Sequence, residues 1–184
     1  MQVEQDRKLE LLHRILNRQE GAFLVFARTK RGAERLARRL SDQGIKTAAI
    51  HGDRSQNQRN QALRGFQDGR YCVLVATDIA ARGIHVNGIS HVINYDLPQV
   101  PEDFIHRVGR TGRACARGTS STFGTRSERS AVAHIERTLA MRLIRCNDAG
   151  EVSTDQADAT TKPQPRRWRS FGPATSRRRR IHAI

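Results

Sequence analysis

Cysteine is scarce in this sequence, and its few cysteines do not lie where a metal site or a set of disulfides would need them. Cys72, Cys115 and Cys146 are the three present, and none belongs to a C-x-x-C pair or a Cys/His cluster. This spacing argues against a zinc site and against a disulfide framework. We therefore expect no metal ligand in the chain and a reducing, cytoplasmic environment.

Long apolar runs and Gly-Lys pairs are also absent. The segment 1–10 is charged rather than apolar, and no run approaches the ~20 apolar residues that cross a bilayer. We therefore expect neither a signal peptide nor a membrane span.

Without a Gly-Lys pair there is no G-x-x-x-x-G-K-[ST] loop to cradle the phosphates of a nucleotide, so the chain is not expected to hold a nucleotide in this way by itself.

Acidic residues are few compared with basic ones. The sequence has 18 Asp and Glu against 33 Lys and Arg, which gives a net charge of +15. A positive field of this size attracts phosphate polymers, so nucleic acid is the expected partner. The length of 184 residues, with 37% hydrophobic and 5% aromatic residues, suits one core and a tail.

The apolar residues recur with two periods along the chain. Spacings near 3.6 residues predict helices over 4–18, 31–40, 55–66, 102–108 and 127–139. Short apolar runs predict buried strands over 22–27, 46–50, 71–76, 91–95 and 118–123. Ser55 and Ser127 are predicted N-caps, and Gly21 is predicted to end the first helix in a left-handed conformation.

This alternation of strands and helices predicts an α/β fold. Right-handed crossovers between successive strands give a parallel sheet with helices on both faces. Such sheets bind ligands at the C-terminal ends of their strands. Thr29, His51, Thr77 and Asp96 each lie within a residue or two of a predicted strand end, and they mark the expected ligand-binding edge.

From about residue 147 the apolar pattern stops, and the composition changes. The segment 162–184 contains no acid and eight basic residues: Lys162, Arg166, Arg167, Arg169, Arg177, Arg178, Arg179 and Arg180. Such a segment cannot bury a core, so we expect a folded domain over 1–146 and a disordered Arg-rich tail over 147–184. Trp168 and Phe171 lie among the arginines, which suits a segment that binds single strands, although a merely solubilising tail is the alternative.

The segment 106–113, HRVGRTGR, concentrates three arginines and a histidine in eight residues. Arg110 and Arg113 are three residues apart, so they can share one helical face and reach one polyphosphate. This is an arginine-finger arrangement. A solvated basic turn is the alternative reading of the segment taken by itself.

Four blocks together resemble the C-terminal RecA-like lobe of DEAD-box RNA helicases, over roughly residues 1–145. The segment 23–30, FLVFARTK, is similar to motif IV, and SQNQR at 55–59 is similar to motif IVa. The segments 76–83, ATDIAARG, and 106–113 resemble motifs V and VI. The resemblance implies a RecA-like three-layer sandwich that closes on an N-terminal RecA-like lobe, with ATP, Mg²⁺ and RNA bound across the cleft.

The resemblance also implies roles for individual residues. Arg110 and Arg113 match the positions that reach the γ-phosphate. In the family, a network of residues links the bound nucleotide to the other lobe, and its positions are matched here by His106, Arg107 and Gly109. The positions that contact the RNA backbone are matched by Arg59, Thr77, Gly83, Thr29 and Lys30. His85 stands where the family commonly has an aspartate that binds the ribose, and imidazole accepts a hydrogen bond only when neutral, so the ribose contact is in question.

Three neighbouring features have structural interpretations. Asp78 is expected to cap the helix that follows it, and Arg82 is expected to pair with a nearby acid. The segment 51–53, HGD, is either an ordinary strand-to-helix loop or part of the site.

The chain also lacks an Asp-Glu-Ala-Asp-like run that could hold Mg²⁺. With the phosphate loop absent as well, half of the catalytic machinery is missing. We therefore expect the C-terminal lobe of an ATP-dependent RNA helicase, inactive alone, that supplies arginine fingers to ATP bound by an N-terminal lobe. The alternative is a non-catalytic RNA-binding module derived from such a lobe.

Overall fold

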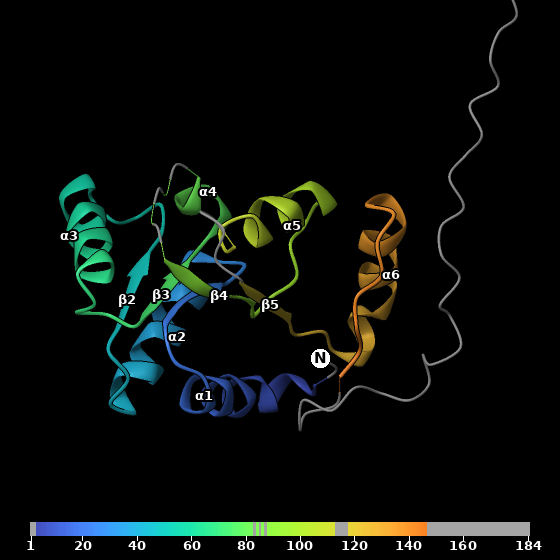
Figure 1. Cartoon of the computed structure of the whole chain (residues 1–184), viewed down its shortest axis with the longest axis horizontal. Helices are drawn as coiled ribbons and strands as arrows, with labels where there is room; N and C mark the ends of the chain where they lie inside the picture. The colour runs from blue at the N-terminus through green and yellow to red at the C-terminus, as the bar shows by residue number, and fades with distance from the viewer. Residues whose placement is uncertain (1–2, 83, 85, 87, 113–117, 147–184) are drawn as a thin grey trace, which may run out of the picture. The chain divides into compact units, whose positions relative to one another are not determined.

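A computed structural model describes residues 3–82, 84, 86, 88–112 and 118–146. Three of the predicted site residues, Gly83, His85 and Arg113, lie outside these ranges, as does the predicted tail. Within them, five parallel strands form one sheet in the order β2-β3-β1-β4-β5 (Figure 1). The strands are β1 (Ala22–Phe26), β2 (Thr47–Ile50), β3 (Val73–Ala76), β4 (Ile89–Asn94) and β5 (Thr119–Thr122).

Six α-helices connect and cover the strands in the described part of the chain. They are α1 (Lys8–Arg18), α2 (Lys30–Asp42), α3 (Gln56–Gln67), α4 (Asp78–Ala81), α5 (Pro101–Val108) and α6 (Arg129–Thr138). Short 3₁₀ turns at Gln5–Arg7 and Arg126–Glu128 precede α1 and α6. None of the described helices is long and apolar enough to cross a membrane.

The central strands are buried on both faces, as the run of apolar residues predicted. In β1, Phe23 and Val25 enter the core under α1 and α2, whereas Leu24 and Phe26 enter the core under α3 and α4. This division follows from the two-residue period of a strand. Helices therefore cover both faces of the sheet, and the predicted α/β architecture is confirmed (Figure 1).

Ser55 is the N-cap of α3, as predicted, and its hydroxyl accepts a hydrogen bond from the Gln58 amide at 3.3 Å. The predicted cap of the last helix was wrong. A 3₁₀ turn intervenes there, and Thr125 begins it with a capping box to Glu128 in place of Ser127. A one-turn helix, α4, follows β3 at the place where Asp78 was expected to cap a helix.

Gly21 adopts the predicted positive φ, +117°, and the Ser90 side chain leaves no room there for a Cβ. The first helix ends at Arg18, as predicted, but its C-cap is Gln19 in extended conformation, so Gly21 does not end it. The left-handed residue therefore starts the strand β1 rather than ending the helix.

Candidate functional site

The C-terminal ends of the strands carry a hollow between α4 and α5. It has a volume of about 230 Å³, and its lining residues are Phe26, Asp78, Ala81, Arg82, Asp103, His106, Arg107 and Arg110. The helix α4 belongs to the segment 76–83, and α5 leads into the segment 106–113. The fold thus brings together two of the sequence blocks that were singled out, at the edge where parallel sheets bind ligands.

Arg107 lies at the base of this hollow, almost fully buried, and its guanidinium binds other residues of the domain. Its side chain is 1% exposed, and its Nε and one terminal nitrogen donate to the two carboxylate oxygens of Asp78 at 2.6 and 2.7 Å. The other terminal nitrogen donates to Asn94 Oδ1 at 3.1 Å and to the Asp96 carbonyl at 2.7 Å. A guanidinium held in this way by four hydrogen bonds can position the residues around it.

Asp78 has a different structural role from the predicted one. It is the first residue of α4, whereas Thr77 occupies the N-cap position and makes no capping hydrogen bond with its side chain. The prediction that Asp78 caps the helix was therefore wrong. Its carboxylate instead neutralises Arg107 in a bidentate pair, the geometry in which arginine and carboxylate fit best.

Arg110 is half-buried at the rim of the hollow. Its Nε donates to the His106 carbonyl at 3.2 Å, and one terminal nitrogen donates to the Ile84 carbonyl at 3.0 Å. These contacts hold the base of the guanidinium on α5 and on the segment after α4. His106 and Gly109 are exposed nearby, and a Cβ on Gly109 would lie 3.1 Å from the Ile105 carbonyl oxygen.

The predicted RNA-contacting residues lie along the same edge of the sheet. Arg59 is half-buried and reaches from α3 to the Ala80 carbonyl, at 3.2 Å, so it braces α4. Thr29 is the N-cap of α2, and its hydroxyl accepts from the Gly32 amide at 2.9 Å. Lys30 is exposed and pairs with Asp53 at 2.6 Å, whereas Thr77 is buried.

The loop after β2 is tightly packed. His51 is buried, its Nε2 lies 3.0 Å from a Glu34 carboxylate oxygen, and Arg54 donates to the same oxygen at 2.6 Å. The hydrogen bond with His51 holds the pKa of Glu34 below its usual value, and Arg54 lowers this pKa further against the opposing effect of burial. These contacts favour the structural interpretation of segment 51–53. Arg82 pairs with Asp103 at 3.5 Å, which confirms the predicted ion pair.

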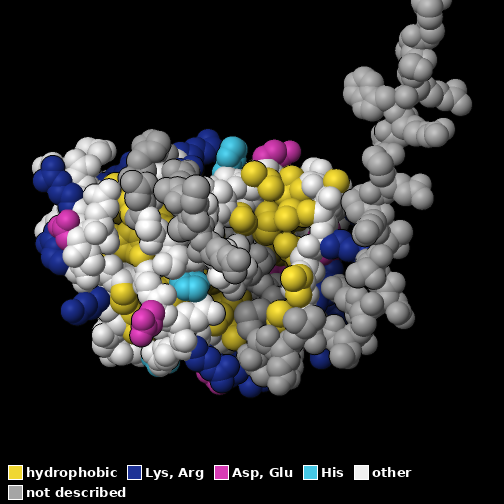
Figure 2. Space-filling model, in the orientation of Figure 1, with side chains coloured by type: hydrophobic (Ala, Val, Ile, Leu, Met, Phe, Trp, Pro, Cys, Tyr) yellow, Lys and Arg dark blue, Asp and Glu magenta, His cyan; other side chains and the backbone are white. Residues whose placement is uncertain are grey.

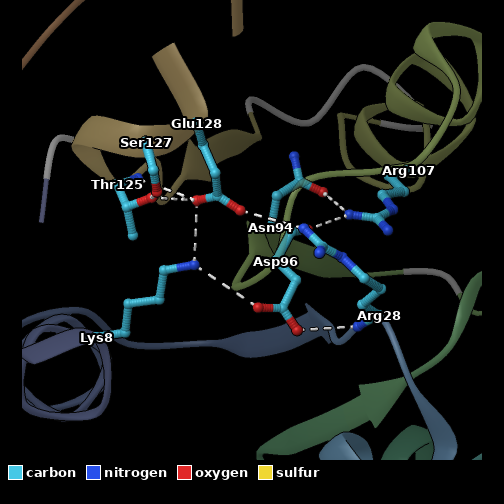
Figure 3. Close-up of polar contacts among 8 residues, drawn as sticks. All are labelled: Lys8, Arg28, Asn94, Asp96, Arg107, Thr125, Ser127 and Glu128. Carbon is cyan, nitrogen blue, oxygen red and sulfur yellow. Dashed lines mark hydrogen bonds and ion pairs between the residues drawn. The ribbon is translucent and has the colours of Figure 1, made fainter. Parts of the chain in front are cut away.

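The sequence did not point to one polar cluster, which we call the Lys8 cluster: Lys8, Arg28, Asp96 and Glu128 (Figure 3). The Lys8 side chain is 1% exposed, and its Nζ lies 3.6 Å from Asp96 Oδ1 and 3.5 Å from Glu128 Oε2. Arg28 donates its backbone amide to Asp96 at 3.0 Å and its guanidinium to Glu128 at 3.1 Å. Burial would raise the pKa of Glu128, but hydrogen bonds from Thr125 and the charges of Lys8 and Arg28 lower it overall.

A family model described as the helicase conserved C-terminal domain matches residues 7–115 of the chain. The DEAD-box ATP-dependent RNA helicase CshA of Geobacillus kaustophilus (strain HTA426) is 44% identical over 146 residues, which are 79% of this chain and 31% of that protein. The chain thus spans about a third of the length of this relative.

Solved structures agree with this match. The crystal structure of the Escherichia coli DEAD-box protein SrmB bound to regulator of ribonuclease activity A is similar with a TM-score of 0.75 and 32% identity, over 83% of this chain and 92% of that chain. The C-terminal domain of the DEAD-box protein Dbp5 is similar with a TM-score of 0.67 and 30% identity, over 73% of this chain and 79% of that chain.

Proposed function

The chain belongs to the helicase conserved C-terminal domain family, as the C-terminal helicase domain of a DEAD-box RNA helicase, and we propose from this that it works as one half of an ATP-dependent RNA-remodelling enzyme. The other half in this proposal is an N-terminal RecA-like lobe, joined in the same chain or added as a separate one. The observation that carries the proposal is the hollow between α4 and α5, where the carbonyls of His106 and Ile84 hold the side chain of Arg110 at the rim.

In this proposal Arg110 and Arg113 stabilise the γ-phosphate of ATP while its charge spreads during transfer. That role is electrostatic and needs no bond to the arginine itself. The rim of the hollow fits a polyanion, because Arg82, His106 and Arg110 line it. It offers Mg²⁺ little, since Asp78 is bound to Arg107 and Asp103 to Arg82. We therefore assign ATP binding through Mg²⁺ to the N-terminal lobe.

RNA would lie along the same edge of the sheet. Lys30 and Thr29 are exposed there, and Arg59 is half-exposed, so each can offer a donor to a phosphate or a ribose. Thr77 and Gly83 are proposed to contact the same backbone, and His85 the ribose of ATP. Contacts of this kind hold RNA in place without reading its sequence.

The test is reconstitution with the N-terminal lobe of a DEAD-box helicase. We expect the 184-residue chain alone to hydrolyse ATP no faster than buffer, with or without RNA, because it lacks the phosphate loop. The mixture of both lobes should show RNA-stimulated phosphate release above the rate of the N-terminal lobe alone. RNA-stimulated turnover by the chain alone would contradict the proposal.

A non-catalytic RNA-binding module is the second candidate function, and the net charge of +15 favours it. In this case the lobe binds RNA, but adding an N-terminal lobe restores no hydrolysis. The reconstitution therefore separates the two functions.

We expect RNA binding to be sequence-tolerant and to be carried largely by the basic segment 162–184. If about six to eight phosphates are neutralised, the logarithm of the affinity should fall steeply with the logarithm of the salt concentration, by roughly 0.7 per phosphate for a single strand. Deletion of residues 162–184 should flatten this slope, measured by fluorescence anisotropy with a labelled single strand. An unchanged slope would place the binding site on residues 1–161.

A further inference from the structure

We propose that Lys8 is a positioning residue for segment 106–113, acting through Asp96 on Arg107. The significance of this link for catalysis depends on the function proposed above, but the link itself is a property of the isolated chain. It joins α1, the first helix of the domain, to the arginine that anchors the candidate site.

The first step of the link is the burial of a charged lysine. The Nζ of Lys8 is buried without a hydrogen-bond partner in the described part of the chain, although two carboxylates lie 3.5 and 3.6 Å away. It also lies 5.8 Å from the centre of the Tyr95 ring. A buried ammonium is costly unless charges of opposite sign surround it, so Lys8 strongly favours the arrangement in which both carboxylates face it.

The second step passes through Asp96, which follows β4. One carboxylate oxygen of Asp96 faces Lys8, the other accepts from the Arg28 amide at 3.0 Å, and its carbonyl accepts from Arg107 at 2.7 Å (Figure 3). The side chain of Asp96 is thus fixed from α1 and from the loop after β1, while its backbone holds a guanidinium nitrogen. A change in the position of Asp96 must therefore alter the environment of Arg107.

The third step is the repulsion that Lys8 prevents. Asp96 and Glu128 both face the ammonium, and without it their two negative charges would face each other with only Arg28 nearby. Like charges at such range repel, and repulsion would shift the Asp96 loop more readily than Glu128. The reason is that Glu128 is held by two hydrogen bonds from Thr125, each at 3.0 Å.

The experiment follows, by NMR in the full chain, the N–H signal of the terminal Arg107 nitrogen that donates to the Asp96 carbonyl, without ATP, RNA or another lobe. Lys8→Met removes the charge and keeps an unbranched side chain. We expect this signal to shift, and its hydrogen to exchange with solvent about tenfold faster or more, because the hydrogen bonds that protect it open more often. Asp96→Asn removes the attraction of Lys8 for Asp96 without creating repulsion, so it should act in the same direction but more weakly. In the double variant the repulsion is absent, so its effect should be smaller than that of Lys8→Met, since coupled residues are not additive.

The control is Leu16→Ala, which loosens the packing of α1 against the core without touching a charge. It should leave the Arg107 signal unchanged while amides of α1 exchange faster. The proposal is overturned if Lys8→Met leaves the Arg107 signal unchanged, or if Leu16→Ala moves it as far, because Lys8 would then only anchor the helix. Should Lys8→Met not fold, Asp96→Asn decides the question alone, and neither result depends on whether reconstitution with an N-terminal lobe restores hydrolysis.

Discussion

Arg110→Ala is expected to lower the RNA-stimulated ATP turnover of the two reconstituted lobes by about a thousandfold or more, the usual worth of an arginine that stabilises phosphoryl transfer. The structure gives the reason for expecting a specific effect. Arg110 lies at the rim of the hollow, where two backbone carbonyls fix the base of its side chain. A charge that is already held in place does not have to reorient when the transition state forms, so little free energy is spent on reorganisation.

The stability of the domain should change much less than its activity. Arg110 is half-buried and donates to the carbonyls of His106 and Ile84, so its loss should cost about 1 to 3 kcal/mol, the usual net worth of two such hydrogen bonds. Urea unfolding of the isolated chain measures this cost. Arg113→Ala, at a position outside the described residues, is expected to lower turnover in the same assay.

Arg82→Ala is the matched control for Arg110→Ala. It removes the same charge from the lining of the same hollow, but Arg82 is 71% exposed and pairs with Asp103 at 3.5 Å. The turnover of this variant should fall by less than about tenfold, because Arg82 is not expected to contact the phosphate group that is transferred. Equal losses for the two variants, or a loss for Arg110→Ala that matches the fraction of unfolded protein, would contradict the finger role.

The sheet and its ligand-binding edge could be predicted from the sequence because their signals are local. A short apolar run that fills two cores, such as residues 22–26, has no exposed face and therefore no alternating pattern. Thr77 follows such a run directly and Thr29 follows one within a few residues, which placed both near strand ends before the fold was known. The boundaries differ by a few residues because helix and strand ends depend on caps and turns.

The role of Arg107 could not be predicted, because its partners are distant in the sequence. Asp78 lies 29 residues before it and Asn94 lies 13 before it, and only the folded sheet brings both to α5. Sequence similarity placed Arg107 in a network between nucleotide and lobes. The structure shows that its guanidinium binds Asp78, Asn94 and the Asp96 carbonyl within the domain, and its role toward a nucleotide stays a prediction.

The burial of Lys8 had a sequence signal that was easy to misread. Lys8 precedes Leu11 and Leu12 by three and four residues, so it shares the inward face of α1. A lysine at such a position commonly extends its ammonium to solvent along the apolar surface. Here Asp96 and Glu128, from two other parts of the chain, keep the charge inside instead.

Arg107→Met is expected to destabilise the domain by about 3 to 5 kcal/mol, the range for breaking one side of a buried ion pair. The variant removes both hydrogen bonds to Asp78 and leaves its carboxylate without the guanidinium. It also leaves the side chain of Asn94 and the carbonyl of Asp96 without their donor. Because Asp78 is 23% exposed and can be partly rehydrated, the lower end of the range is expected.

Urea unfolding followed by circular dichroism measures this effect, and Arg82→Met is its matched control. The control removes an arginine of the same hollow that is itself 71% exposed and lies 3.5 Å from Asp103, so its free energy of unfolding should change by no more than about 0.5 kcal/mol. Asp78→Asn should also destabilise the domain, and the double variant should cost less than the sum of the two single variants, because each single change removes the same pair.

If Arg107→Met instead leaves the free energy of unfolding unchanged while turnover of the reconstituted lobes falls, then Arg107 faces the ligand rather than Asp78. In that case segment 106–113 would supply three arginines to the ligand, and Arg107 would not serve as an anchor for Arg110 and Arg113.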